Sequence, residues 1–364
     1  MYVAHLRLNT EVLSSLVDFP CSAMNSYTKQ TILLVFFTCT CSGTDSWNGT
    51  LPNGYLLGLK VNQIDQPRFN RYYNHVSLFK IEFDGTVTEF WNYSLNSSDT
   101  LISDNLFAID IENELVYLGS EDLFLALDMT TGTTKIKIHL EVPNLQFFLS
   151  YDYFAKEKAI YGVCTGNSMF DWCRMKRTGI NSAKLEFLYH LPYTEELGPI
   201  DDLYFIDQNE QTLWYYPYDA AVGINYTNGD VVFDGSAESL DVPDDCIVYD
   251  HITKRVFTHI WNGNSFYSVG LGEIFPKPKQ RKILLDMSAQ YGDLAVARIG
   301  TCAYDQTTHT MIALMRNFTT FNLLPTHLLL IDTISLTYKL IPLPTFQEKG
   351  WDNISALRFI PHKL

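Results

Sequence analysis

The sequence is poor in basic residues, long apolar runs and helical periodicity. Only 26 of its 364 residues are Lys or Arg against 41 Asp or Glu, so the formal net charge is −15. A charge of this sign repels phosphate backbones and anionic lipids. No segment beyond the N-terminal region approaches the roughly 18 apolar residues of a membrane-spanning helix, and none keeps apolar residues at i, i+3, i+4 and i+7 for long. We therefore expect no nucleic-acid partner, no membrane span and no helix in the main body of the chain.

Common catalytic motifs are missing as well. The 9 histidines do not fall in HExxH or another metal-binding spacing, and no Gly-rich phosphate loop is present. Residues 162–166, GVCTG, have the spacing of a nucleophile elbow, but that motif needs a helix after the turn and no helical pattern follows. The basic segment Pro276–Lys282 is interpreted as a solvated turn.

The sequence does contain a repeated β pattern. Residues 106–140 predict four short strands rich in β-branched and aromatic residues, separated by turns rich in Asp, Asn, Gly, Ser and Thr. Four antiparallel strands in about 35 residues is the size of one propeller blade. The first hairpin of the pattern is an apolar run ending in Asp, a polar turn and a second apolar run. It recurs with its Asp at Asp110, Asp152, Asp207, Asp250 and Asp305.

The copies recur in a regular rhythm of two alternating spacings. The intervals between these Asp residues are 42, 55, 43 and 55, and the copy at Asp152 is expected to carry two extra residues in its turn. We expect each Asp to cap its turn by accepting backbone N–H groups. The alternative is an acidic Ca²⁺-binding ring around a central channel.

The two ends of the repeat complement each other. The region after residue 53 predicts three strands with no leading strand, and the chain ends with one unaccompanied strand, Ile354–Pro361. We therefore predict an all-β, six-bladed β-propeller of four-stranded antiparallel blades, closed by the C-terminal strand pairing into the N-terminal blade. Closure would remove exposed strand edges. A single propeller domain is expected over residues 44–364.

The N-terminal region has the pattern of a secretory signal peptide. Lys29 precedes the apolar run TILLVFF, which is followed by small and then polar residues. We assign the signal peptide to residues 24–43, expect translation to begin at Met24, and expect residues 1–23 to be untranslated or disordered. A buried strand is the alternative for the apolar run.

In a secreted protein, the sequons can be interpreted as glycosylation sites and the cysteines as disulfide partners. Asn-x-Ser/Thr sequons are candidate glycosylation sites on exposed loops, and they occur at Asn48, Asn92, Asn96, Asn225, Asn317 and Asn353. Four of the 7 cysteines follow the leader, which allows three pairings. Of these we favour Cys164 with Cys173 and Cys246 with Cys302.

The repeated hairpin, over about residues 53–361, resembles those of six-bladed β-propellers of secreted and extracellular proteins, namely the YWTD, NHL and SMP-30/paraoxonase-lactonase types. No full YWTD tetrapeptide is present, and LVYLGS and TLWYYP match it only in part. The resemblance implies the fold. Through the lactonases it also implies Ca²⁺ at the mouth of the central channel, but it transfers no catalytic residue.

Two sets of residues are candidates for ligand binding. The segment 62–75 is predicted to be a loop that interrupts the first unit, and its Arg and aromatic residues have the composition of a binding anchor. The expected contacts are Arg68, Phe69, Arg71 and Tyr72. The alternative is a loop folded over the rim with its Arg residues paired to local carboxylates. The second set lies on the connections expected at the same rim, where it could bind Ca²⁺ or form a solvated acidic surface: Asp122, Asp202, Asp245 and Asn262.

These observations predict a secreted, glycosylated propeller that binds an extracellular protein or a small molecule at its loop-bearing rim. No cofactor is expected in that case, and the chain is more readily interpreted as a binding module than as an enzyme. The alternative is a Ca²⁺-dependent hydrolase or lactonase of the SMP-30 type. An inactive relative of such enzymes, kept as a carrier, is a third interpretation.

Overall fold

The computed structural model describes most of the chain after residue 46. The chain divides into two units, Met1–Thr44 and Asp45–Leu364, and the predicted signal peptide and residues 1–23 lie outside the described residues. The described residues are 47–64, 72–94, 107–119, 123–141, 148–165, 170–192, 204–208, 210–215, 222–234, 246–259, 270–274, 282–287, 291, 294–296, 302–317, 324–351 and 354–362.

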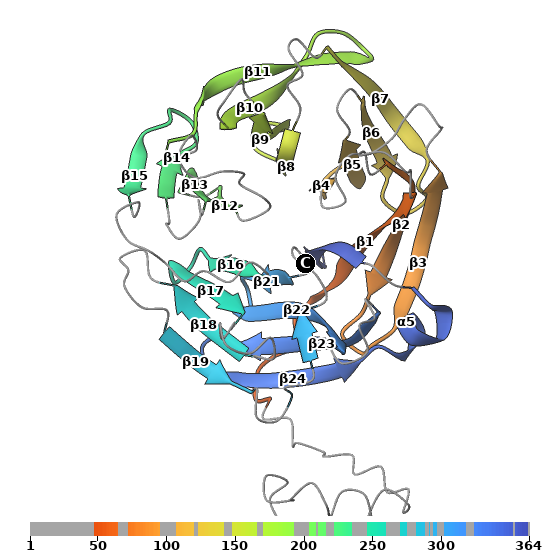
Figure 1. Ribbon diagram of the computed structural model, residues 1–364, viewed down its shortest axis with the longest axis vertical. Helices are drawn as coiled ribbons and strands as arrows, with labels where there is room; N and C mark the ends of the chain where they lie inside the picture. The colour runs from red at the N-terminus through yellow and green to blue at the C-terminus, as the bar shows by residue number, and fades with distance from the viewer. Residues whose placement is uncertain are drawn as a thin grey trace, which may run out of the picture. The chain divides into compact units, whose positions relative to one another are not determined.

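The described strands of the larger unit fall into six antiparallel groups of four, called blades 1–6 below (Figure 1). Blade 1 contains β25 (Ile354–Pro361), β1 (Gly54–Ile64), β2 (Tyr72–Ile81) and β3 (Val87–Ser94). Blade 2 contains β4 (Phe107–Asp110), β5 (Leu115–Gly119), β6 (Leu123–Asp128) and β7 (Thr134–Glu141). Blade 3 contains β8 (Phe148–Phe154), β9 (Ala159–Thr165), β10 (Phe170–Arg177) and β11 (Ser182–His190).

The remaining blades continue the order. Blade 4 contains β12 (Tyr204–Asp207), β13 (Thr212–Tyr215), β14 (Val222–Asn225) and β15 (Val231–Asp234). Blade 5 contains β16 (Ile247–Asp250), β17 (Arg255–His259), β18 (Gly270–Ile274) and β19 (Lys282–Asp286). Blade 6 contains β21 (Cys302–Asp305), β22 (Thr310–Asn317), β23 (Pro325–Asp332) and β24 (Thr337–Pro342), and the short β20 (Leu294–Val296) also pairs with β22.

The first strand of each blade is innermost and the fourth is outermost. Figure 1 shows β4, β8, β12, β16 and β21 nearest the middle and β3, β7, β11, β15, β19 and β24 at the outside. Blades 2 and 3 share one eight-stranded sheet because their outer strands β7 and β11 pair in parallel, with Ser182 opposite His139.

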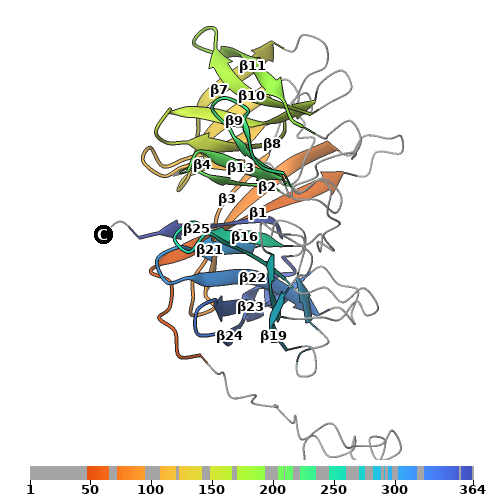
Figure 2. The ribbon, with the colours of Figure 1, turned by 90° about the vertical axis from the view of Figure 1, so that its left-hand side faces the viewer.

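The C-terminal strand β25 completes blade 1. It pairs antiparallel with β1 from Gly54 opposite Pro361 to Lys60 opposite Ile354, and Figure 2 shows it beside β1. Ser355 Oγ donates to Leu59 O at 3.1 Å. The predicted pairing of the last strand with the first blade is confirmed.

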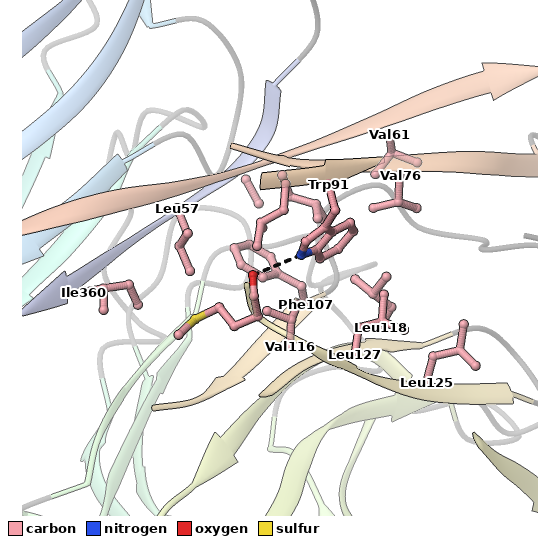
Figure 3. Close-up of a cluster of buried hydrophobic side chains, with 14 of the residues drawn as sticks. Leu57, Val61, Val76, Trp91, Phe107, Val116, Leu118, Leu125, Leu127 and Ile360 are labelled. Atoms are coloured by element: carbon pink, nitrogen blue, oxygen red, sulfur yellow. Dashed lines mark hydrogen bonds between the residues drawn. The ribbon is translucent and has the colours of Figure 1, made fainter. Parts of the chain in front are cut away.

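The core consists of apolar clusters that span neighbouring blades. Strand β1 is buried on both faces, so its side chains alternate between two clusters. Leu57 packs with Phe107 between blades 1 and 2, and Leu56 packs with Leu330 between blades 1 and 6. Trp91 Nε1 donates to Met129 O at 3.0 Å across the first of these interfaces (Figure 3). Similar clusters join blade 2 to 3, 3 to 4 and 5 to 6.

A short helix departs from the prediction of an all-strand body. The helix α5 (Pro344–Lys349) connects β24 to β25 and buries Phe346 against Phe79 and Trp351. It begins with Pro, which suits the first helical turn, and ends at Gly350 with φ +64°. At six residues it is too short to produce a detectable helical period.

Candidate functional site

The antiparallel order of each blade gives the unit two distinct rims. The connections between first and second strands and between third and fourth strands lie at one rim, the turn rim. The connections between second and third strands, and from one blade to the next, lie at the other, the loop rim. The described residues include most of the turn rim, whereas most loop-rim connections lie outside them.

Four of the five repeated Asp residues cap turns at the turn rim, as predicted. All four carboxylates are buried. Asp110 accepts from Asn113 N at 3.1 Å and Asp207 from Glu210 N at 3.2 Å. The other two act in the same way: Asp250 accepts from Ile252 N at 2.9 Å, and Asp305 from Thr307 N at 3.0 Å. Each turn ends with a non-glycine residue at positive φ, between 52° and 58°.

Asp152 does not cap a turn, and the two-residue insertion expected in its copy is wrong. Strand β8 continues to Phe154, which pairs with Ala159. The turn Ala155–Lys158 is therefore four residues long, as are the turns of the other copies. Phe154 takes the capping position and is fully buried. Asp152 lies two residues earlier inside the strand. Asp152, which aligns with the capping Asp residues in the sequence, is therefore not their structural equivalent.

A second element of the repeat links one blade to the next. The residue before the capping position is Tyr153 in blade 3, Tyr249 in blade 5 and Tyr304 in blade 6. Burial, together with a hydrogen bond to Asp110, raises the pKa of Tyr153, and burial with the charge and hydrogen bond of Asp207 does the same for Tyr249. Tyr304 OH donates to Asp250 at 3.1 Å. Each Tyr thus reaches the capping Asp of the preceding blade.

Where the capping residue is apolar, the partner on the next blade is also apolar. Phe154 of blade 3 lies in the cluster against which Ile206 of blade 4 packs. In blade 1 the position is Pro361, and Ile109 of blade 2 packs on the cluster that contains Ile360. The Tyr is thus absent where the preceding blade has no capping Asp, and it accompanies the Asp at three of the four remaining interfaces; the exception is Asp305 of blade 6, because the corresponding residue of blade 1 is Ile360. The signal for this contact is present in the sequence as the Tyr in IVYD and CAYD, but the expected repeat was defined by its Asp alone.

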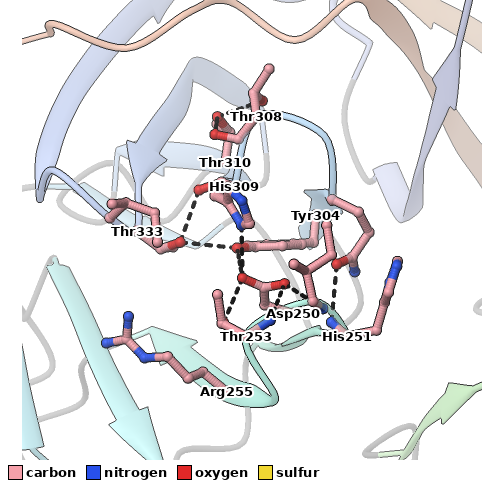
Figure 4. A network of polar contacts seen from close by, with 12 residues as sticks. Asp250, His251, Thr253, Arg255, Tyr304, Thr308, His309, Thr310 and Thr333 are labelled. Carbon is pink, nitrogen blue, oxygen red and sulfur yellow. Dashed lines mark hydrogen bonds and ion pairs between the residues drawn. The ribbon is translucent and has the colours of Figure 1, made fainter. Parts of the chain in front are cut away.

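The densest polar network surrounds Asp250 (Figure 4). Its Oδ2 lies 2.8 Å from His309 Nδ1, and Tyr304 OH also contacts Thr333 Oγ1 at 2.9 Å. Although burial opposes ionisation, hydrogen bonds from Thr253 and His309 outweigh it and hold the pKa of Asp250 below its usual range. The network consists of side chains satisfying one another, which identifies it as a structural link between blades 5 and 6.

The predicted binding loop is partly strand. β1 and β2 stay paired beyond Val61, through Asn62 opposite His75 to Ile64 opposite Tyr72, with a register shift near Asn62. The loop assignment for the whole of 62–75 is therefore wrong. Tyr72 is the first residue of β2, whereas Arg68, Phe69 and Arg71 lie outside the described residues.

The second predicted set is also outside the described residues. Asp122, Asp202, Asp245 and Asn262 belong to connections between described strands whose adjoining ends lie at the loop rim, where β1 ends at Ile64 and β2 begins at Tyr72. Within the described ranges, no group of three or more His, Cys, Asp or Glu side chains is placed to hold a metal ion. The Ca²⁺-dependent alternative depends on undescribed carboxylates and stays a prediction.

Both favoured disulfides are confirmed. Cys164–Cys173 joins β9 to β10 within blade 3, with Cα atoms 6.1 Å apart, and Cys246–Cys302 joins blades 5 and 6, with Cα atoms 5.8 Å apart. Disulfides persist in oxidising compartments, so the pair indicates a location outside the cytosol. No helix in the described part of the chain is long and apolar enough to cross a membrane.

The sequons occupy different environments. Asn48 and Asn92 are exposed, the latter on the outer strand β3. Asn225 Oδ1 accepts from Thr227 N at 2.9 Å in the β14–β15 turn, and Asn317 ends β22. Asn96 and Asn353 lie outside the described residues. Glycosylation of these sites stays a prediction.

Comparison with known proteins supports the architecture. No protein-family model matches the chain, and no curated protein matches it in sequence. Among solved structures, TolB from Acinetobacter baumannii is similar at a TM-score of 0.50 and 11% identity, over 84% of this chain and 67% of that one. The periplasmic gluconolactonase PpgL of Pseudomonas aeruginosa is similar at a TM-score of 0.43 and 8% identity, over 78% and 82% of the two chains. Identities this low bear on fold alone. The likeness to TolB, together with the sheet order, makes this chain a β-propeller in architecture.

Proposed function

We propose that the chain is a secreted, N-glycosylated propeller that binds a protein or small-molecule ligand at its loop rim. The observation that carries this proposal is the length of the β1–β2 hairpin. β1 pairs with β25 only from Gly54 to Lys60, but its pairing with β2 continues to Ile64. The described part of the hairpin therefore extends past the inner strand, and residues 65–71 connect its two strands in the sequence.

The composition of residues 65–71 fits a binding anchor. Arg68, Phe69 and Arg71 combine cationic and aromatic groups, which give a large contact area on few side chains. They stand out on a chain with a net charge of −15. A rigid β scaffold that presents a short connecting segment is the usual arrangement of binding sites on loops.

The opposite rim is a poor competitor for this role. The capping carboxylates at the turn rim are buried and accept hydrogen bonds from their own turns and from neighbouring blades. Ligand binding there would have to break contacts that hold the blades together. This difference favours the loop rim as the binding surface.

The test is quantitative affinity capture from conditioned medium with immobilised mature protein. We expect Arg68→Ala with Arg71→Ala to lose at least about 90% of the captured partner, because hot-spot Arg side chains commonly contribute 2 kcal/mol or more. The matched control is Lys156→Ala with Lys184→Ala, which removes the same charge from exposed positions elsewhere. Both double variants should melt at the wild-type temperature. Equal capture by the two variants would contradict the proposal.

Secretion and glycosylation have their own test. Expression in a secreting eukaryotic host should place the protein in the medium with a new N-terminus near Ser42–Gly43, and enzymatic removal of N-glycans should lower its mass. Retention of residues 1–43 or an unchanged mass would contradict this part of the proposal.

A further inference from the structure

The outermost strands of the blades differ in how their edges are protected. Each described sheet ends on one side at an outer strand, apart from the sheet in which β7 and β11 pair with each other (Figure 1). An unpaired edge can pair with a strand of another molecule, and Lys side chains on the edge strand commonly prevent this. Four outer strands contain Lys, namely β7 (Lys135 and Lys137), β11 (Lys184), β19 (Lys282) and β24 (Lys339). Strands β3 and β15 contain neither Lys nor Arg, so their edges need another form of protection.

The two outer strands without Lys are the ones that a sequon accompanies. Asn92 lies on β3 and is exposed. Asn225 ends β14, and its backbone N–H donates at 2.8 Å to the carbonyl oxygen of Asp230, the residue before β15. Asn317, the other sequon on a described strand, ends β22, which is the second strand of blade 6. The sequons of blades 1 and 4 therefore lie in the hairpins that contain the outer strands.

Strand β15 has an apolar surface that needs covering. Val231 is 43% exposed and Val232 is 56% exposed, and in the described part of the chain they are the one pair of exposed large apolar residues that are neighbours in the sequence. Val231 pairs with Ile224, the residue before Asn225. Val231 and Val232 thus lie one and two residues along β15 from the position opposite Asn225, which is about 3 and 7 Å. A group attached to Asn225 would stand beside both.

The turn that Asn225 caps does not require Asn. Asn225 Oδ1 accepts from Thr227 N at 2.9 Å. The equivalent turns of blades 2 and 6 are capped by Asp128 and Asp332, each of which accepts a backbone N–H of its own turn through Oδ1 at 2.8 Å. An Asp would therefore serve the turn of blade 4 equally well. What Asn225 has and an Asp lacks is the amide nitrogen Nδ2, the atom to which an N-linked glycan is attached.

We propose that N-glycans at Asn225 and Asn92 cover the outer edges of blades 4 and 1 and keep copies of the chain from associating edge to edge. The presence of these glycans rests on the secretion and glycosylation that the proposed function includes. Each glycan takes the role that Lys has on the other outer strands, because a bulky, solvated group beside an edge excludes an incoming strand. In the modification, Nδ2 bonds to the anomeric carbon of a lipid-linked oligosaccharide and loses one hydrogen as a proton, and the lipid pyrophosphate leaves.

The experiment measures self-association of the protein secreted by a eukaryotic host, by light scattering during size-exclusion chromatography over a range of concentrations. Asn225→Asp removes the glycan but keeps the oxygen that caps the turn. It should raise self-association by about tenfold or more, the effect of burying an exposed Val at a contact. Adding Val232→Lys should reverse this, because a Lys then protects the edge. On β3, Asn92→Gln should associate and Asn92→Lys should not. The control Asn317→Gln removes a sequon that is not at an outer strand and should behave as the wild type does.

Three results would overturn the proposal. The first is a secreted wild type whose Asn225 and Asn92 are unmodified by mass spectrometry. That result would leave ligand binding at the loop rim untouched, because capture by the Arg68 and Arg71 variants tests it separately. The second is equal self-association of the wild type, Asn225→Asp and Asn92→Gln. The third is association of Asn225→Asp that Val232→Lys does not reduce. Thermal melting identifies any variant that fails to fold, and the two variants at Asn92 decide the matter if Asn225→Asp is one of these.

Discussion

The interface between blades 5 and 6 and the interface between blades 4 and 5 use the same repeat but differ in reinforcement. Both contain the contact of a Tyr with the capping Asp of the preceding blade. Blades 5 and 6 add an apolar cluster that includes Phe257 and Met311, and the disulfide Cys246–Cys302. Between blades 4 and 5, no cluster of buried apolar side chains in the described residues spans the gap. Lys254 instead lies 3.4 Å from Asp207 and 2.9 Å from Glu210.

This difference separates the inter-blade contacts that the sequence repeat specifies from those that it does not. Turn capping and the Tyr–Asp contact recur because they act through the strand-to-turn junction, which the sequence repeats. The apolar clusters depend on the middle strands of two different blades, which vary in length and composition. Burying one Leu or Phe contributes about 1.5–3 kcal/mol, whereas an exposed ion pair contributes about 0–1 kcal/mol. We therefore expect the interface of blades 4 and 5 to be the weaker of the two.

The largest expected effect comes from placing in blade 3 the capping Asp that the other copies have. Phe154→Asp should destabilise the fold by about 5 kcal/mol, because it removes a buried ring and leaves an unpaired carboxylate in its place. The Phe154 ring centre lies 4.7 Å from that of Tyr161 and 5.1 Å from that of Tyr226. Adding Ile206→Tyr should recover about 1–3 kcal/mol as a coupling energy, because the hydroxyl can then donate to the new Asp.

Urea unfolding of the wild type, both single variants and the double variant measures this coupling. The control is Ile206→Tyr alone, which gives the cost of a Tyr with no Asp to meet. Strict additivity of the two substitutions would show that the Tyr and the Asp do not depend on each other.

The second effect removes the covalent link of blades 5 and 6. Replacing Cys246 and Cys302 together by Ala should lower the free energy of unfolding by about 4 kcal/mol, since the bond closes a chain segment of 56 residues. The matched pair Cys164 and Cys173 are 9 residues apart and should cost about 2.5 kcal/mol. Denaturant titration of both double variants tests the order, and a larger loss from the shorter segment would reverse it.

The third effect separates turn capping from inter-blade bonding. Asp250→Asn should cost about 2–3 kcal/mol near pH 7, because it weakens hydrogen bonds to a charged acceptor within a buried network. Asp305→Asn is the control, since Asp305 accepts hydrogen bonds within its own turn, from Thr307 N and Thr308 Oγ1. It should cost about 1 kcal/mol. Equal losses would assign the whole effect to capping.

Asp250 also predicts the direction in which the free energy of unfolding changes with pH. The pKa of Asp250 is lower in the folded state than its usual value, so the unfolded chain binds more protons as the solution becomes acidic. The stability that Asp250 contributes is present above the ordinary Asp range and is lost as the pH falls through it and then through the lowered folded pKa. Unfolding free energies measured from pH 6 to pH 3 should therefore fall less steeply for Asp250→Asn than for the wild type.

Much of this architecture could be predicted because its signals are local. The repeated Asp, the polar turn and the alternating strands each lie within a few residues, and the unmatched strands at the two ends indicated how β25 pairs. The disulfide partners followed from the same placement of repeats. The error at Asp152 has the same origin: LSYD looks like the other copies, and only the packing of Phe154 against blade 4 shows which residue ends the strand.

The rest depends on contacts between distant segments. The Tyr–Asp contact joins residues more than 40 positions apart, such as Asp110 and Tyr153, and it becomes visible only when neighbouring blades are aligned in space. The extension of β1 and β2 depends on cross-strand pairing that overrides the polar composition of residues 62–64. The order of the strands establishes at which rim the connections with the candidate ligand residues begin and end. The contacts of Arg68 and Asp202 are to be determined by experiment.

The smallest expected effect lies at the interface of blades 4 and 5. Lys254→Gln keeps the length of the side chain but removes its charge, and it should lower the unfolding free energy by less than about 1 kcal/mol, because the Lys254 side chain is 48% exposed and solvent screens its ion pairs. Raising the salt concentration from 50 mM to 500 mM should reduce even this difference. The matched control is Arg255→Gln in blade 5, whose partner Glu273 is buried and lies 2.6 Å away. Its loss should be larger, because it leaves a buried carboxylate unpaired. A loss for Lys254→Gln as large as that for Arg255→Gln, and insensitive to salt, would mean that the ion pairs of Lys254 hold blades 4 and 5 together as strongly as packing holds the other blades.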